Sequence, residues 1–180
     1  MRKCRGDDPN TLIVDELALC LGAARVDVAV VNGSVHGYEI KSPRDTLARL
    51  PGQADVYGRV LDYVTIVVGE THAKAVDGAI PAWWGVWSAV ECNAGVRLKQ
   101  VRKARRNPAT DPLAIAQLLW RNEALDALAE RGLAEGMRSK PRAALWRRLA
   151  ERVPLRELQD VVRQCLKNRP AGWRSDAPPV

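Results

Sequence analysis

The chain has 180 residues, of which 47% are hydrophobic and 27% charged. This composition is that of an ordinary globular domain with enough apolar material for a core. No apolar run approaches the roughly 20 residues that a membrane-spanning helix needs. The start of the chain also lacks the apolar stretch of a secretory signal. We therefore expect a cytoplasmic protein without a membrane partner. The four cysteines lie far apart and form no CxxC pair, which argues against a zinc site or a disulfide framework.

The net charge of +7 is distributed unevenly along the sequence. Residues 96–169 contain 18 Lys and Arg against 8 Asp and Glu, whereas the rest of the chain contains 10 against 13. A basic half joined to a mildly acidic half favours a polyanionic partner, and nucleic acid is the natural one. The alternative is that the arginine-rich helices form a solvated surface without such a partner.

The first segments predict a helix, a hairpin and a second helix. Residues 11–22 suit a short helix, with Asn10 as the N-cap and Gly22 as the stop. Two runs rich in β-branched residues follow over 24–42 and flank Asn32-Gly33, which is a strong hairpin signal. Residues 45–63 predict a helix that is broken at Pro51-Gly52 and restarts there. The apolar residues of the first segment are Leu12, Ile13, Leu17, Leu19 and Leu21.

The next segments predict a strand, a short helix and a second hairpin. The sequence VTIVVGE, residues 64–70, is a continuous apolar run of the kind found in a strand covered on both faces. A short helix is expected over 71–79. A second hairpin should then turn near Asn93-Ala94-Gly95, between GVWSAVE and VRLKQVRK.

After Asn107-Pro108 the sequence becomes helical and basic. Asp111-Pro112 is an N-cap followed by proline at the first helical position, and the helix that it opens should end near Gly132. Two further amphipathic helices are expected over 140–153 and 155–168. The expected organisation is a core over 1–107, a basic helical unit over 108–169 and a disordered tail over 170–180.

The residues that could carry chemistry lie between 25 and 42. Glu39 and Lys41 flank Ile40 in one predicted strand, so their side chains share a face of the sheet. Asp27 lies in the preceding strand. It joins the other two only if the hairpin register places it on the same face.

The register depends on the length of the hairpin loop. Pairing Val31 with Val35 leaves a three-residue loop and sets Asp27 opposite Glu39, with Cβ atoms about 5 Å apart. A two-residue loop would instead oppose Asp27 to Tyr38, on the other face, unless a bulge restored the phase. The sequence alone leaves both registers open.

Two facing carboxylates in an apolar sheet repel each other and are costly to desolvate. A divalent cation would remove both problems, and Mg²⁺ prefers oxygen ligands while keeping waters that a phosphate can replace. Lys41 would then help to position the attacking water and stabilise charge on the phosphate. The alternative is that Asp27 and Glu39 face solvent and that Lys41 is their ion-pair partner.

Three short motifs occur in a fixed order. Arg25-Val26-Asp27 lies in one predicted strand, Glu39-Ile40-Lys41-Ser42 in the next, and Gln53 and Tyr57 on the helix that follows. Together they resemble the PD-(D/E)XK nuclease superfamily, and the QxxxY element is similar to that of its RecB-type branch. More closely, the run 14–87 resembles a family of small bacterial proteins predicted to be nucleases of this fold. Arg25-Val26 stands where the superfamily name has proline.

This resemblance implies a fold and an activity. The fold would be a restriction-endonuclease-like α/β core, with a mixed central sheet flanked by helices and a C-terminal helical unit. The activity would be metal-dependent hydrolysis of phosphodiester bonds in DNA. Mg²⁺ would be the cofactor, and Mn²⁺ would substitute for it.

The resemblance also implies roles for the matching acids and the lysine. Asp27 and Glu39 match the principal metal ligands, and Lys41 matches the catalytic lysine. Glu16 matches an acid on the first helix that serves as a further metal ligand. Asp15 is a rival for that role, and the alternative is that Glu16 is only helix surface.

Two further groups complete the candidate site. Gln53 and Tyr57 are neighbours on one helix face and match the pair that supports the site or the substrate. The alternative is that Tyr57 belongs to the core and Gln53 to the surface. If DNA binds, a basic run at the end of the second hairpin should meet its phosphates. This run consists of Arg102, Lys103, Arg105 and Arg106.

Two other functions stay open. The first is a non-catalytic nucleic-acid-binding module on the same fold, although intact Glu39 and Lys41 favour the enzyme, because a degenerate site commonly loses one of them. The second is a scaffold protein whose basic helices dock other proteins, which salt-sensitive DNA binding would exclude. DNA is the expected partner, and a homo-oligomer is left open.

Overall fold

The computed structural model describes residues 10–170 and 173, apart from 74 and 94. The strands are β1 (Leu12–Leu19), β2 (Ala24–Val31), β3 (Val35–Lys41), β4 (Tyr63–Gly69), β5 (Gly85–Cys92) and β6 (Gly95–Arg102). The α-helices are α1 (Leu50–Val60), α2 (Pro112–Ala116), α3 (Arg121–Ala129), α4 (Arg142–Arg152) and α5 (Leu155–Asn168).

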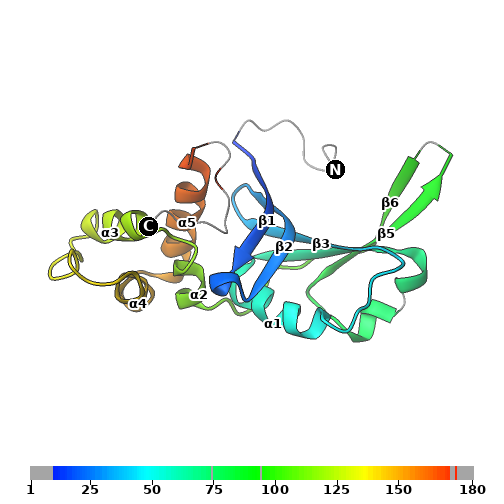
Figure 1. Cartoon of the computed structure of the whole chain (residues 1–180), viewed down its shortest axis with the longest axis horizontal. Helices are drawn as coiled ribbons and strands as arrows, with labels where there is room; N and C mark the ends of the chain where they lie inside the picture. The colour runs from blue at the N-terminus through cyan, green and yellow to red at the C-terminus, as the bar shows by residue number, and fades with distance from the viewer. Residues whose placement is uncertain (1–9, 74, 94, 171–172, 174–180) are drawn as a thin grey trace.

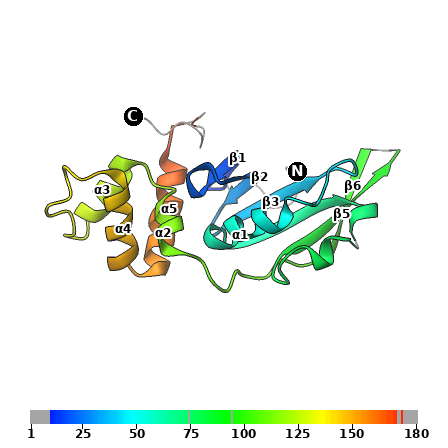
Figure 2. The ribbon, with the colours of Figure 1, turned by 60° about the horizontal axis from the view of Figure 1, so that its bottom comes forward.

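These strands form one mixed sheet in the order β1-β2-β3-β4-β5-β6. β4 runs parallel to both β3 and β5, and the other neighbouring pairs are antiparallel. α1 lies against the sheet, and α2 to α5 gather beside one end of it (Figure 1; Figure 2). The expected α/β class, a mixed sheet flanked by helices and followed by a helical unit, is confirmed.

The first element is a strand where the apolar spacing predicted a helix. The buried residues of β1 are Val14, Leu17 and Leu19. Leu17 and Leu19 are two residues apart, as in a regular strand, whereas Val14 and Leu17 are three apart. Glu16, which lies between Val14 and Leu17, has a φ of 55°. A regular strand alternates its faces with a period of two, and the left-handed residue breaks this alternation. Apolar residues three apart therefore imitated a helical pattern, and the prediction of a helix over 11–22 was wrong.

The hairpin formed by β2 and β3 has the register with the longer loop. Val31 pairs with Val35, and the pairing continues to Val28 and Tyr38. The central glycine of the three-residue loop has a φ of 62°, a conformation that glycine adopts without steric strain. This is one of the two registers that the sequence left open, and it is the one that points Asp27 towards Glu39.

The segments between β3 and β6 follow the prediction with two changes. α1 begins at Leu50 rather than at residue 45, because Asp45 Oδ2 accepts a hydrogen bond from the Ser42 N–H at 2.7 Å and closes a local turn. The helix expected over 71–79 is replaced by two short 3₁₀ turns, Glu70–His72 and Ala75–Gly78. The strand β4 and the hairpin of β5 and β6 are confirmed.

The C-terminal unit contains the expected helices with one break. Asp111 caps α2 by accepting from two backbone N–H groups of its first turn, as predicted. The helix expected to reach Gly132 is divided into α2 and α3. Glu123 accepts from the Trp120 N–H at 2.7 Å, which caps a new helix start. α5 spans the predicted residues.

Part of the predicted tail packs on the helices. The Arg169 guanidinium lies over the rings of Trp120 and Trp173, 4.2 and 4.3 Å from their centroids. The rest of the segment expected to be disordered, residues 171–172 and 174–180, lies outside the described residues.

A buried carboxylate joins the helical unit to the sheet. Asp62 is 2% exposed. Its Oδ2 accepts from the Val35 N–H at 2.8 Å, and its Oδ1 accepts from Gln159 Nε2 of α5 at 3.1 Å. Guanidinium nitrogens of Arg106 and Arg163 lie 3.6 and 3.8 Å from the same carboxylate. One hydrophobic cluster also contains buried side chains of both units, so the units share a core.

None of the described helices is long and apolar enough to cross a membrane. Cys20, Cys92 and Cys165 are free thiols. Cys4 lies outside the described residues.

Removing the Asp62 carboxylate should destabilise the chain. Asp62→Ala leaves the buried Val35 N–H and the Gln159 amide without their acceptor, and each unsatisfied buried group costs about 1–3 kcal/mol. We expect the free energy of unfolding, measured by urea denaturation, to fall by about 2–4 kcal/mol. Asp55→Ala, which removes an exposed carboxylate of α1, should change it by less than about 0.5 kcal/mol. Equal unfolding midpoints for the two variants would contradict this role.

Candidate active site

Glu39 is a buried carboxylate at the centre of the candidate site. It lies in β3 and is 1% exposed. Lys41 Nζ and Gln53 Nε2 donate to its Oε1 at 2.6 and 2.8 Å, and the Tyr57 hydroxyl lies 2.7 Å from its Oε2. A buried charge is costly unless it is paired and hydrogen-bonded, and these donors meet both requirements. The expectation that Glu39 and Lys41 share one face is confirmed.

Gln53 and Tyr57 reach Glu39 from α1, one helical turn apart. Gln53 Nε2 also donates to the Tyr57 hydroxyl oxygen at 3.3 Å. The Tyr57 hydroxyl lies 2.6 Å from the Arg25 carbonyl oxygen of β2, so one phenol connects β2 with β3. Burial, followed by the bond to Glu39, holds the pKa of Tyr57 well above its ordinary value. The phenol therefore stays protonated and acts as a donor.

Asp27 lies where the backbone pairing of β2 and β3 ends. The last paired residues are Val28 and Tyr38, and one further step in the same register places Asp27 opposite Glu39. At this point the Ile40 N–H donates to Asp27 Oδ2 at 2.6 Å. A side-chain oxygen thus takes the place of a backbone acceptor and holds the carboxylate against β3.

The surroundings of Asp27 disfavour its negative charge. Burial is the largest cause that raises the pKa of its carboxyl, and the charges of Glu39 and Glu16 raise it further. The bond from the Ile40 N–H and the charge of Lys41 act in the opposite direction. A carboxyl with its pKa raised in this way is common at functional sites.

Glu16 lies in a strand, which corrects the helical position expected for it. The residues on either side of Glu16 pair with those on either side of Asp27, so the two acids face each other across β1 and β2. The left-handed backbone of Glu16 costs about 1–3 kcal/mol and persists only where surrounding structure holds it. Its rival Asp15 is exposed and pairs with Val28. The strained residue is thus the acid beside Asp27.

Sequence reasoning did not find two contributors to this cluster. The Arg25 carbonyl oxygen is a backbone atom, and no residue pattern marks it as an acceptor. Trp84 is fully buried and stacks on Tyr57, with ring centroids 5.8 Å apart. The sequence does not indicate which side chain a buried tryptophan supports.

The predicted phosphate-binding run occupies several environments. Arg102 pairs with Asp77 at 2.6 Å and also donates to backbone carbonyls, so its charge is used within the fold. Arg106 is exposed beside the Asp62 carboxylate. Lys103 and Arg105 are exposed. The exposed members can meet phosphates, whereas Arg102 has a structural role.

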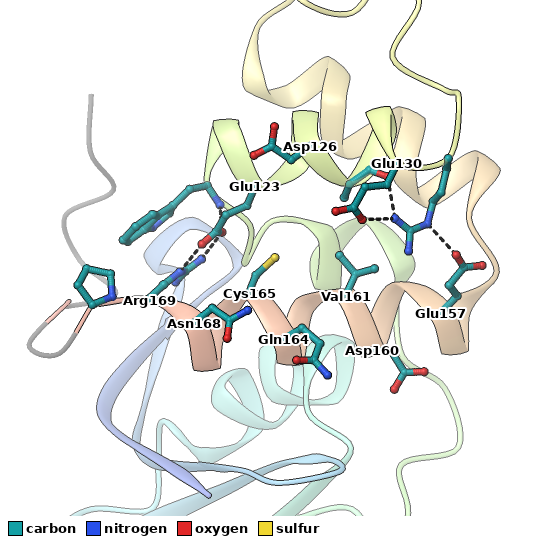
Figure 3. Close-up of a pocket in the computed structure, with 14 residues that line it drawn as sticks. Glu123, Asp126, Glu130, Glu157, Asp160, Val161, Gln164, Cys165, Asn168 and Arg169 are labelled. Carbon is teal, nitrogen blue, oxygen red and sulfur yellow. Dashed lines mark hydrogen bonds and ion pairs between the residues drawn. The ribbon is translucent and has the colours of Figure 1, made fainter. Parts of the chain in front are cut away.

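An acidic groove lies elsewhere, between α3 and α5. It has a volume of about 630 Å³ and includes none of the residues of the candidate site. Figure 3 shows Arg169 paired with Glu123. Arg131 forms ion pairs with Glu130 and Glu157 in the same groove. Carboxylates outnumber arginines in its lining, so the groove repels phosphates. Its charged residues are Glu123, Asp126, Glu130, Arg131, Glu157, Asp160 and Arg169.

Comparison with known proteins places the chain in a phage family. The family model described as bacteriophage P4 protein cII matches residues 2–173. The chain belongs to the bacteriophage P4 protein cII family. It is 27% identical over 157 residues to protein cII of Enterobacteria phage P4, which covers 87% of this chain and 59% of that protein. The chain therefore spans 59% of the length of this curated relative.

The chain also has a partial match among solved structures. A protein of unknown function from Silicibacter pomeroyi matches 68% of this cII-family chain, and 81% of its own chain is covered, with 22% identity and a TM-score of 0.41.

The carboxylates of this cII-family chain suit a Mg²⁺ ion that keeps much of its own water. No group of three or more His, Cys, Asp and Glu side chains able to hold a metal occurs among the described residues. Mg²⁺ is commonly held by one or two carboxylates, and waters and phosphates fill the other positions. Asp27 uses one oxygen for the Ile40 N–H. Glu39 has three donors, and a carboxylate accepts about four, so each carboxylate keeps an acceptor position that an ion could use.

The raised pKa of Asp27 predicts pH-dependent stability. A carboxyl whose folded pKa exceeds its unfolded value of about 3.9 binds more protons when folded, so its contribution to stability falls as the pH rises through that window. Asp27→Asn removes the penalty of the ionised form. In EDTA, we expect this variant to melt above wild type at pH 7, with the difference shrinking as the pH falls towards 4.

The matched control is Asp55→Asn, which changes an exposed carboxylate of α1 and should show no such pH-dependent difference. A melting temperature of Asp27→Asn at or below wild type at pH 7 would show that burial does not dominate the energetics of Asp27.

Proposed function

We propose that this cII-family chain is a metal-dependent nuclease that hydrolyses phosphodiester bonds in DNA. The observation that carries the proposal is the network around Glu39, in which Lys41, Gln53 and Tyr57 meet one buried carboxylate. Asp27 lies on the neighbouring strand, and its carboxylate accepts from the N–H of Ile40, the residue after Glu39. These are the positions that the resemblance to the PD-(D/E)XK superfamily requires, and the basic half of the chain suits a polyanionic substrate.

Each residue has a distinct task in this proposal. Asp27 and Glu39 would hold Mg²⁺, which when bound supplies polarisation of the phosphodiester and a water of lowered pKa. Lys41 places its side-chain nitrogen beside Glu39, where it can orient the attacking water and stabilise charge on the phosphate. Gln53 and Tyr57 fix the direction of the Glu39 carboxylate. Because the pKa of Tyr57 is raised, it acts as a donor and not as the general base.

One observation favours a second candidate function, a non-catalytic nucleic-acid-binding module. The Glu39 carboxylate is already satisfied by three donors, one of which is the Lys41 ammonium. Such a network is self-sufficient, so it can stabilise the fold without a metal. The two candidates differ in turnover and share DNA binding.

Both candidates predict salt-sensitive DNA binding by the full chain. Neutralising each phosphate of duplex DNA changes the slope of log K against log salt by about −0.9. We expect several such contacts, measured by fluorescence anisotropy with labelled duplex DNA in EDTA between about 50 and 200 mM salt. Affinity independent of salt would favour a protein-docking scaffold. The full chain is required, because deletion after Asn107 removes Gln159 from the buried Asp62.

Substitutions in the network should separate cleavage from metal binding. Lys41→Ala should lower the rate of DNA cleavage at least about a hundredfold and leave Mn²⁺ affinity, measured by calorimetry, near the wild-type value. Asp27→Asn and Glu39→Gln should abolish cleavage and also weaken Mn²⁺ binding, because each removes a negative charge from a hard-cation site. Labelled DNA and RNA with Mg²⁺, Mn²⁺ or EDTA report turnover.

Asp55→Asn is the matched control for the two carboxylate variants, and it should cut and bind metal like wild type. Cleavage by Lys41→Ala at the wild-type rate would remove the lysine from the mechanism. Equal Mn²⁺ affinity for Asp27→Asn and wild type would remove Asp27 from the ligand set and favour the non-catalytic module.

A further inference from the structure

The hairpin of β5 and β6 extends beyond the rest of the sheet. β4 pairs with β5 as far as Gly69 and Ala89, whereas β5 and β6 continue to pair with each other up to Cys92 and Gly95. The two strands project past the other strands in both views of the ribbon drawing (Figure 1; Figure 2). The outer part of the hairpin is therefore a two-stranded arm, and we call this hairpin the β5–β6 arm.

The charges of the β5–β6 arm are separated by face. Residues 85–106 contain six Lys and Arg and one acid, Glu91. Successive side chains of a strand alternate between the two faces of the sheet. Arg97 and Lys99 therefore lie on one face of β6, whereas Gln100 and Val96, the partner of Glu91, lie on the other. One face of the arm thus carries two cations, and the acid lies on the opposite face.

Both cations are available to a ligand. Arg97 and Lys99 are exposed, and within the described part of the chain neither forms an ion pair. Arg102, at the base of the arm, differs from them. Its guanidinium donates to Asp77 Oδ1 at 2.6 Å and to the Trp84 carbonyl oxygen at 2.8 Å. These bonds hold the base in place, so the outer cations project from a fixed support.

The face that carries the two cations is also the face of the candidate active site. Lys41 pairs with Val68, Val68 with Ser88, and Ser88 with Lys99. Paired residues of neighbouring strands point to the same side of a sheet, so Lys41 and Lys99 share a face. Three strand spacings separate them, roughly 14 Å. This is the length of about four base pairs of duplex DNA. Arg97 lies on the same face, nearer to the tip of the arm.

We propose that the β5–β6 arm enters the major groove of duplex DNA, where Arg97 and Lys99 contact the DNA. The inference rests on the proposed function for the nature of the partner and deepens it by naming the surface that holds the duplex beside the cut. The major groove of B-DNA is about 12 Å wide and admits a two-stranded β-ribbon. Cations that neutralise phosphates there release condensed counterions, which supplies affinity.

The proposal also distinguishes DNA from RNA. The major groove of duplex RNA is deep and narrow, and side chains cannot read it. The arm should therefore contribute to the binding of duplex DNA and contribute little to the binding of duplex RNA.

The test measures binding of the full chain to a fluorescein-labelled DNA duplex and to the RNA duplex of the same sequence, in EDTA, by anisotropy at several salt concentrations. Arg97→Gln and Lys99→Gln should each weaken DNA binding about three- to tenfold at about 100 mM salt and reduce the salt slope by about one contact. The same variants should weaken binding of the RNA duplex less than about twofold.

Gln100→Glu is the matched control variant. It lowers the net charge by one, as Lys99→Gln does, at the neighbouring position on the opposite face of the arm. Both positions are exposed, so neither change should alter the fold. Gln100→Glu should weaken DNA binding less than about twofold.

The outcomes separate this inference from the nuclease proposal. If the Arg97 and Lys99 variants lose affinity for duplex DNA as expected while wild type cuts no substrate with Mg²⁺ or Mn²⁺, the contact made by the arm stands and the nuclease proposal fails. If wild type cuts DNA but both variants bind it as wild type does, the contact is wrong and the nuclease stands.

Three further results would overturn the contact. Equal losses for Lys99→Gln and Gln100→Glu would mean that only the overall charge of the hairpin matters. Equal losses on the DNA and RNA duplexes would mean that the arm stays outside the major groove. Absence of any DNA binding by wild type would overturn both the contact and the nuclease proposal.

Discussion

The fold around the candidate site depends on the burial of one carboxylate. Glu39 is almost inaccessible to solvent in an apolar sheet, where an unsatisfied charge would cost several kcal/mol. Its donors come from β3 itself and from two positions one turn apart on α1. The need of this carboxylate for hydrogen-bond donors therefore fixes α1 on its face of the sheet. Through Tyr57 and the Arg25 carbonyl oxygen, the same requirement fixes the start of β2.

The network gives Asp27 and Glu39 different sets of hydrogen-bond donors. Glu39 has an ammonium and two neutral donors, whereas the bond given to Asp27 comes from one backbone N–H, that of Ile40. Burial therefore raises the pKa of Asp27, and the facing Glu16 raises it further. A cation attracted to this pair would gain most at Asp27, and at Glu39 it would use the acceptor position that the three donors leave open. Whether a metal takes that position is the physical question that separates an enzyme from a structural network.

Local patterns predicted a large part of this arrangement. The alternation of a strand placed Glu39 and Lys41 together, and helical spacing placed Gln53 beside Tyr57. The hairpin register stayed open between two loop lengths in the sequence, and the structure has the three-residue loop. The helix predicted at β1 failed because the left-handed backbone of Glu16 shifts the phase of the strand, and that conformation is held by tertiary structure.

Other features depend on partners distant in the sequence. α3 starts anew at Trp120 because Glu123 caps it, and Glu123 is itself held by Arg169, 46 residues later. The Asp62 contact spans 97 residues to Gln159. The similarity to the phage relative assigns no role to any residue of this chain. The roles proposed for Asp27, Glu39 and Lys41 therefore depend on their geometry and on the motif that they form.

The helical unit has two hollows with opposite charge in their linings, and two residues line both of them. Trp120 and Arg169 line both the acidic groove and a cavity of about 340 Å³ beside the β1–β2 turn, whose other charged lining residues are Arg25 and Arg142. Carboxylates outnumber arginines in the groove, whereas none of the described residues that line the cavity is acidic. Positive and negative side chains therefore gather in different places on the helical unit. The excess of positive charge in residues 96–169 is therefore distributed unevenly over the surface. The net charge of the sequence does not show this distribution.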